Sequence, residues 1–206
     1  MKISEENKVL SAINRFVDLV VVNVLFLITS IPVITIGASI SAMYHVLIRM
    51  TDETEGTIYK TYFKAFRSSF KKATIVWVPI LLILYMLYYN LTFIPQITSG
   101  IPAAILMGIQ ALVALLVFCV VQYYFPLTGY FENTVGTTLK NAFLLSFAYL
   151  PKTLLFLALT LLIPFLVFLM PGIVYIVMFL GLIILFSAIA YIKAFRMSRI
   201  FDQIVE

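Results

Sequence analysis

Hydrophobic positions follow one another in long blocks along the chain, and short polar segments separate the blocks. The blocks predict six membrane-spanning helices, at about 16–31, 34–50, 73–94, 103–125, 153–170 and 173–192. A helix of about 20 apolar residues crosses the hydrocarbon core, and only helices or closed barrels satisfy their backbone polar groups there. The sequence therefore predicts an all-α, polytopic membrane protein with one transmembrane domain over residues 1–206.

The first apolar block is too long for one span and too short for two comfortable ones. Pro32 is the expected break, because proline lacks a backbone donor and disfavours helix at the residue before it. Two short helices fit this pattern, and so does one helix followed by a re-entrant segment. Gly37 and Ser41, with Ala42 beside them, have the small-residue spacing that lets helix backbones pack closely.

A polar helix is predicted at 57–72, between the second and third apolar blocks. One face of it collects the aromatic residues Tyr59, Tyr62, Phe63, Phe66 and Phe70. The flank carries cations with no acid among them, namely Lys60, Lys64, Arg67, Lys71 and Lys72. Each cation adds on the order of 1 kcal/mol of attraction to an anionic membrane surface. We therefore expect an interfacial helix that binds the anionic inner leaflet and offers a docking surface to a partner.

A second interfacial helix is predicted at 134–149, and it repeats part of the first. The pattern AFxxSF occurs at 65–70 and again at 142–147, a period of 77 residues. Each copy lies between two spans, which suggests two units of span, interfacial helix and span. The second copy is apolar nearly all round, so we expect it to be buried against protein.

The cations set the expected topology. With six crossings and an internal N-terminus, all 14 Lys and Arg residues fall on one side, including Lys193 in the C-terminal tail. Cytoplasmic segments carry the excess of Lys and Arg, so both termini are expected in the cytoplasm. The net charge of +5 is interpreted as a topology signal, and no nucleic-acid partner is expected.

Candidate catalytic chemistry is sparse. His45 is the only histidine and Cys119 the only cysteine, and no phosphate-binding loop, zinc motif or nucleophile elbow occurs. We therefore expect no catalytic residues, no cofactor and no metal site, and the chain is not expected to be an enzyme. The remaining polar residues at membrane depth are interpreted as interhelical hydrogen-bonding groups, with a substrate path as the alternative; they are Asn23, Asn90, Gln110 and Gln122.

Three segments in order carry a family resemblance: SIPVITIGASISAMY, YFKAFRSSFKKATIVW and ENTVGTTLKNAFLLSFAYLPKTLL. Together they resemble the YesL family, bacterial membrane proteins of unknown function. Ser69 departs from the asparagine that many members have there. The resemblance implies a bacterial cytoplasmic membrane and an association with carbohydrate ABC importers, and it brings no catalytic residues.

One segment is similar to the cytoplasmic coupling loop of sugar ABC permeases. That loop begins with a glutamate and ends about nineteen residues later in Leu-Pro, as Glu132 and Leu150-Pro151 do here, although its Asp-Gly pair is missing. The candidate residues of this coupling-like segment are Glu132, Lys140, Asn141, Phe143, Phe147 and Pro151.

The function expected from these features is that of a non-catalytic accessory or regulatory subunit of a carbohydrate, or oligosaccharide, ABC import system. Its partners would be the permease subunits, with or without their ATPase, and membrane lipids. A stand-alone secondary transporter or channel is one alternative, and it requires a continuous polar cavity. A lipid-binding membrane scaffold is the other, and it requires the cations of 57–72.

Overall fold

The computed structural model describes the backbone of residues 2–52, 54 and 56–205, and the side chains of those between Leu10 and Phe201. The described residues form helices and connecting turns without any strand, so the predicted all-helical fold class is confirmed. The elements are α1 (Lys2–Ser30), η1 (Val33–Thr35), α2 (Ile36–Thr51), α3 (Ile58–Ile97), α4 (Gly100–Tyr130), α5 (Val135–Ala148), α6 (Leu150–Leu169), η2 (Pro171–Ile173), α7 (Val174–Leu180), η3 (Gly181–Leu185) and α8 (Phe186–Val205). Within this described part, six segments are long and apolar enough to cross a membrane.

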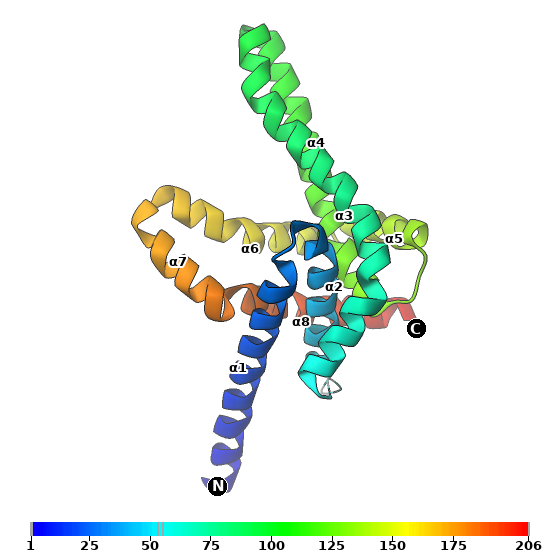
Figure 1. Ribbon diagram of the computed structural model, residues 1–206, viewed down its shortest axis with the longest axis vertical. Coiled ribbons are helices and arrows are strands. Elements are labelled where there is room, and N and C mark those ends of the chain that lie inside the picture. The colour runs from blue at the N-terminus through cyan, green and yellow to red at the C-terminus, as the bar shows by residue number, and fades with distance from the viewer. Residues whose placement is uncertain (1, 53, 55, 206) are drawn as a thin grey trace.

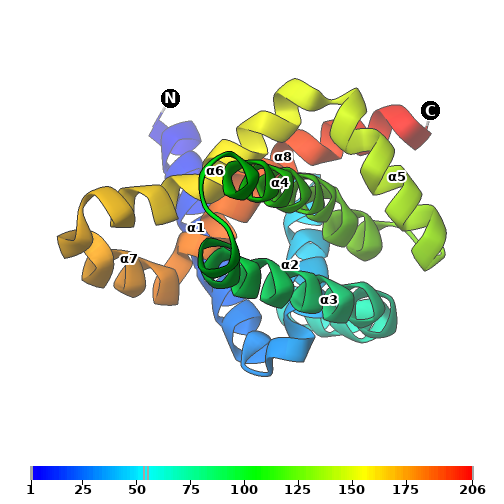
Figure 2. The ribbon, with the colours of Figure 1, turned by 90° about the horizontal axis from the view of Figure 1, so that it is seen from above.

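Helix α2 is the centre of the packing, and α1, α3, α4 and α8 lie around it (Figure 2). Most of its side chains are buried, among them Ala38, Ala42, Val46 and Met50. Small and medium residues on several sides let four helices approach one short helix at once. The core of the protein therefore lies around the second apolar block.

Two helical hairpins extend from this core in different directions (Figure 1). The distal halves of α3 and α4 form one hairpin, which turns at Gly100 with a φ of +68°, a conformation that glycine adopts without strain. Helices α6 and α7 form the other, which turns at Pro171. The facing sides of the two hairpins are separated by the cavity described below.

The first apolar block is divided at the predicted proline. Helix α1 ends at Ser30, and after Pro32 the short helix η1 leads into α2. The Thr35 hydroxyl donates to the carbonyls of Thr29, at 2.5 Å, and Pro32, at 2.7 Å, and so holds the turn closed. The described residues thus form two helices here, each a candidate span.

Helix α3 differs from the prediction, which separated an interfacial helix at 57–72 from a span at 73–94. The structure has one helix of 40 residues. No glycine or proline occurs between Ile58 and Pro79, so a change from polar to apolar side chains does not interrupt the backbone. At 1.5 Å per residue the helix is about 60 Å long, twice the hydrocarbon thickness of about 30 Å. A large part of it must therefore lie outside the hydrocarbon.

Candidate functional site

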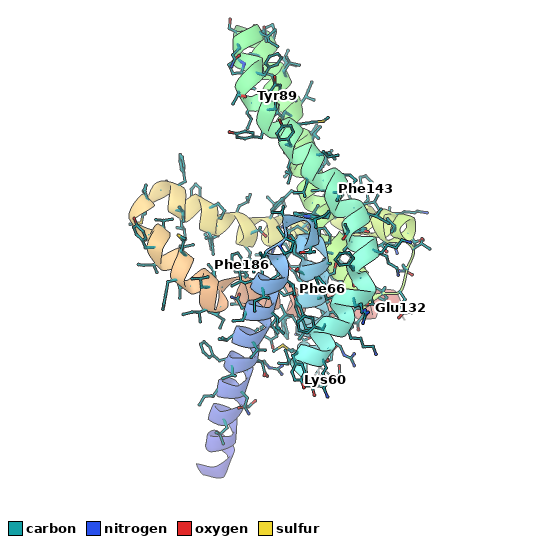
Figure 3. All side chains as sticks on the ribbon, viewed as in Figure 1. Lys60, Phe66, Tyr89, Glu132, Phe143 and Phe186 are labelled. Atoms are coloured by element: carbon teal, nitrogen blue, oxygen red, sulfur yellow. The ribbon has the colours of Figure 1, made fainter. Side chains whose placement is uncertain are left out.

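The predicted cationic face lies on the N-terminal part of α3. Lys60, Lys64, Arg67 and Lys71 are exposed, and Lys72 is half-buried. Figure 3 places Lys60 near one end of this helix and Tyr89 towards the other. These four exposed cations form one accessible surface.

The aromatic residues of this segment do not share one face, which corrects the prediction of a single apolar stripe. Tyr59, Phe63 and Phe70 are exposed beside the cations, whereas Tyr62 is fully buried. The Tyr62 hydroxyl lies 2.7 Å from the Thr29 hydroxyl and 3.4 Å from the Ser39 carbonyl, to which it donates.

The inward face of α3 consists instead of Tyr62 with the small residues Ala65, Ser69 and Ala73. Their spacing of three and four residues is that of one helix face, and small side chains allow close approach to α2 and α4. This spacing is present in the sequence and could have identified the buried face. The prediction followed the aromatic residues instead, because they give the stronger pattern.

Two glycines mark the crossings of the central helices. A Cβ at Gly37 would lie 2.8 Å from Phe125 and 2.9 Å from Trp77, so the predicted packing residue lies where α2 meets both α3 and α4. A Cβ at Gly129 would lie 2.2 Å from the Ser41 carbonyl oxygen. The His45 ring also contacts this crossing, with Nδ1 2.7 Å from the Gly129 carbonyl oxygen. Gly129 was not among the predicted residues, because its role depends on an approach between distant segments.

Helix α5 lies between the loop that holds Glu132 and the start of α6 that holds Pro151. The prediction that α5 is buried against protein is confirmed for the face that packs on α4, where Ala142 and Leu145 are buried, and is wrong for the opposite face. Phe143 is 49% and Phe147 46% exposed, and their rings are 4.9 Å apart. Lys140 is exposed on the same helix, and Asn141 lines a small pocket of about 220 Å³ between α5 and the end of α4. The exposed face was not predicted, because an apolar helix surface does not indicate whether the partner that covers it lies in the same chain.

The small residues of the repeated AFxxSF segments are buried in both copies. Ala65 and Ser69 in the first copy are buried, as are Ala142 and Ser146 in the second. The second aromatic ring of each copy is exposed, at Phe70 and at Phe147 (Figure 3 labels Phe143 from the second copy). Both helices pack on α4. The repeat therefore reflects two helices that pack on one neighbour through small residues.

A cavity of about 750 Å³ lies between the central helices and the two hairpins. Its walls are almost entirely apolar and include Phe26, Phe118, Ile163, Met178 and Phe186. Figure 3 labels Phe186, whose ring centroid is 5.7 Å from that of Phe26. Single ligands are commonly held in pockets of about 300–1,000 Å³ with apolar walls and a few polar groups. The size and lining of this cavity fit that description.

Three polar residues from three helices meet at the cavity: Gln122 of α4, Thr160 of α6 and Lys193 of α8. The Lys193 ammonium donates to Gln122 Oε1 at 2.9 Å and to the Thr160 hydroxyl. The Gln122 amide nitrogen donates to the same hydroxyl at 3.0 Å. Lys193 is only 4% exposed, although the sequence placed it in the cytoplasmic tail. Helix α8 continues past this residue and turns it inward, which the sequence pattern alone did not reveal.

Residues 19–91 match the model of a family described as "Protein of unknown function, DUF624". This is the family to which YesL belongs, so the predicted resemblance holds at that coarser level. No curated protein and no solved structure matches the chain.

The DUF624 match extends from α1 into the distal half of α3. It includes Gly37, Tyr44 and Tyr62. The cavity walls formed by α1, α2 and α3 therefore lie within the match, as does Gly37 at the helix crossing. Gln122, Thr160 and Lys193 lie beyond it, so the polar cluster is a feature of the part of the chain that the DUF624 match does not reach.

The other polar residues at membrane depth are used in helix packing. The Asn23 amide donates to the carbonyls of Gly181 at 2.9 Å and Leu182 at 3.1 Å, and the Gln110 amide donates to the Leu87 carbonyl. Asn90 is exposed. Within the described part of the chain, no group of three or more His, Cys, Asp or Glu residues has the arrangement of a metal site.

Proposed function

We propose that the chain is a non-catalytic accessory or regulatory subunit of a carbohydrate ABC importer in the bacterial cytoplasmic membrane. Both termini would lie in the cytoplasm, with the cations of α3 at the inner leaflet. The observation that carries the proposal is the uncovered apolar face of α5, which consists of Leu139, Phe143, Leu144 and Phe147.

Exposure of this apolar face to water is unfavourable. Each exposed aromatic or leucine side chain gains on the order of 1.5–3 kcal/mol from full burial, so the face favours a covering partner. Lys140 on the same helix and Glu132 just before it add exposed charges of both signs at its border. An apolar centre with a polar rim is the usual composition of a protein interface.

The choice of partner rests on two features. The resemblance to the YesL family associates the chain with carbohydrate importers, and α5 lies between Glu132 and Leu150-Pro151 as a coupling helix does. A permease subunit is therefore the proposed partner, and its ATPase would contact the same cytoplasmic side.

The stand-alone transporter is less well supported. Its substrate path would require the polar residues at membrane depth to line one continuous cavity. Among these residues and His45, only Gln122 lines the cavity, whereas Asn23, His45 and Gln110 bond to backbone carbonyls.

The test is a mild-detergent pulldown of the tagged chain from its native host, followed by mass spectrometry. We expect a carbohydrate permease pair in near-stoichiometric amount, and a loss of at least tenfold for the double variant Phe143→Ser/Phe147→Ser. The matched control is Phe165→Ser/Phe168→Ser near the tip of α6, where both rings are also exposed. Isolation of the wild-type chain alone, or equal losses in both variants, contradicts the proposal.

A further inference from the structure

The polar cluster at the cavity has hydrogen-bonding capacity that the protein does not use. A lysine ammonium has three donors, and the structure gives acceptors to two of them, on Gln122 and Thr160. The Thr160 hydroxyl is fully occupied, because it also donates to the Phe156 carbonyl at 2.8 Å and accepts from Gln122. Gln122 retains one amide N–H. Two donors and one positive charge are therefore available to a ligand.

The charge of Lys193 has no counter-ion among the described residues. Its two partners are neutral, and a buried charge without an opposite charge is costly. The cavity thus has a cationic donor group and otherwise mostly apolar walls.

These features point to an anionic amphiphile. A phosphate group accepts from several donors and supplies the missing negative charge, and an acyl chain matches the apolar walls. We propose that the cavity binds an anionic phospholipid of the inner leaflet, with its phosphate at Lys193 and Gln122 and an acyl chain between α4, α6 and α7.

The size of the cavity is compatible with a lipid. Its volume of about 750 Å³ lies within the range of about 300–1,000 Å³ that is usual for small-ligand pockets, and its apolar walls with one polar cluster suit an acyl chain with its phosphate. The proposal does not depend on the importer partner, because it concerns only groups within this chain.

The experiment uses the full-length chain in nanodiscs of phosphatidylcholine with increasing phosphatidylglycerol, with native mass spectrometry counting retained lipids. Oleate and inorganic phosphate are tested separately. We expect the wild-type chain to retain one phosphatidylglycerol in preference to phosphatidylcholine. In Lys193→Met, the ratio of retained phosphatidylglycerol to phosphatidylcholine should fall at least tenfold. Lys60→Met removes an exposed cation instead and should retain it.

Thermal unfolding separates lost folding from lost binding. Lys193→Met removes a buried charge but also leaves Gln122 Oε1 without its donor, so the variant is compared with itself, without and with anionic lipid. Phosphatidylglycerol should raise the unfolding midpoint of the wild type and leave that of Lys193→Met unchanged. A second variant, Ala114→Phe, fills the apolar wall and should displace the lipid while Lys193 is intact.

Three results would overturn the proposal. Equal retention of phosphatidylglycerol by Lys193→Met and wild type would place the lipid elsewhere, with the exposed cations of α3 as its site. Equal retention of phosphatidylcholine would remove the anionic requirement. Binding of oleate or phosphate without phosphatidylglycerol would show that the cavity takes a smaller ligand than a phospholipid.

Discussion

The side-chain amide of Asn23 in α1 donates to the Gly181 carbonyl at 2.9 Å, at the first residue of the π-helical turn η3. A π-helical turn changes the normal bonding of the backbone, and such turns occur often at functional sites. Asn23 also accepts from the Ser187 backbone N–H at 3.1 Å, so one side chain spans the turn from Gly181 to the start of α8. Gly181 and Leu182 line the cavity. This residue therefore fixes one wall of the candidate lipid site.

Replacing Asn23 should destabilise the protein. Asn23→Leu removes the hydrogen bonds to Gly181, Leu182 and Ser187, and we expect a loss of about 1–3 kcal/mol in the free energy of unfolding. Equilibrium unfolding in a mild detergent measures it. Asn90→Leu is the control, because Asn90 is exposed, and it should change stability by less than about 0.5 kcal/mol. Equal effects of the two substitutions would show that the α1–η3 contact adds no stability.

Two glycines on the same helix should respond in opposite directions. Gly129→Ala places a Cβ 2.2 Å from the Ser41 carbonyl oxygen, so α2 and α4 must separate, at a cost of about 1–3 kcal/mol. At Gly108 nothing lies within 4 Å of the added Cβ, and alanine there should raise stability by about 0.5–1 kcal/mol. Thermal unfolding of the two variants tests this pair. A Gly129→Ala protein as stable as wild type would contradict the close approach.

The buried face of α3 can be tested at its tyrosines. Tyr62→Phe removes a hydroxyl that lies 2.7 Å from that of Thr29, and we expect a loss of about 0.5–1.5 kcal/mol. Tyr59→Phe, on the exposed side of the same helix, should have no measurable effect. Denaturant titration followed by Trp77 fluorescence measures both. The reverse order of effects would place Tyr59 on the buried face.

The proposed topology is tested by thiol labelling of intact cells. In a Cys119→Ser background, Ser99→Cys at the α3–α4 turn should react with a membrane-impermeant maleimide added outside. Ser68→Cys, on the exposed side of the cationic segment, should react only after the membrane is opened. External labelling of Ser68→Cys would place the cations of α3 outside and would contradict the assignment from positive charge.

Sequence reasoning was most successful where a single physical property decides the outcome. The length of the apolar blocks predicts six potential spans, and Pro32 predicts the first break, because both depend on local chemistry. The continuous α3 was missed because polarity was taken as a boundary, although no helix breaker occurs at Lys72. The inward position of Lys193 was missed because a lysine after an apolar block normally marks the membrane surface. Its position depends on contacts with α4 and α6, which no local pattern encodes.

The continuity of α3 has a mechanical consequence. A single helix about 60 Å long transmits displacement along its axis as a lever. A rotation of 5° about its cationic end would move the far tip by about 5 Å, while the hydrogen bonds along its backbone stay intact. Pro79 and Pro95 each remove one backbone hydrogen bond of α3, and Pro79 lies near the middle, so it is the natural hinge between the two halves. A displacement of the cationic segment Lys60–Lys72 would therefore move the α3–α4 hairpin. The cavity lies beside this hairpin, so its width would change.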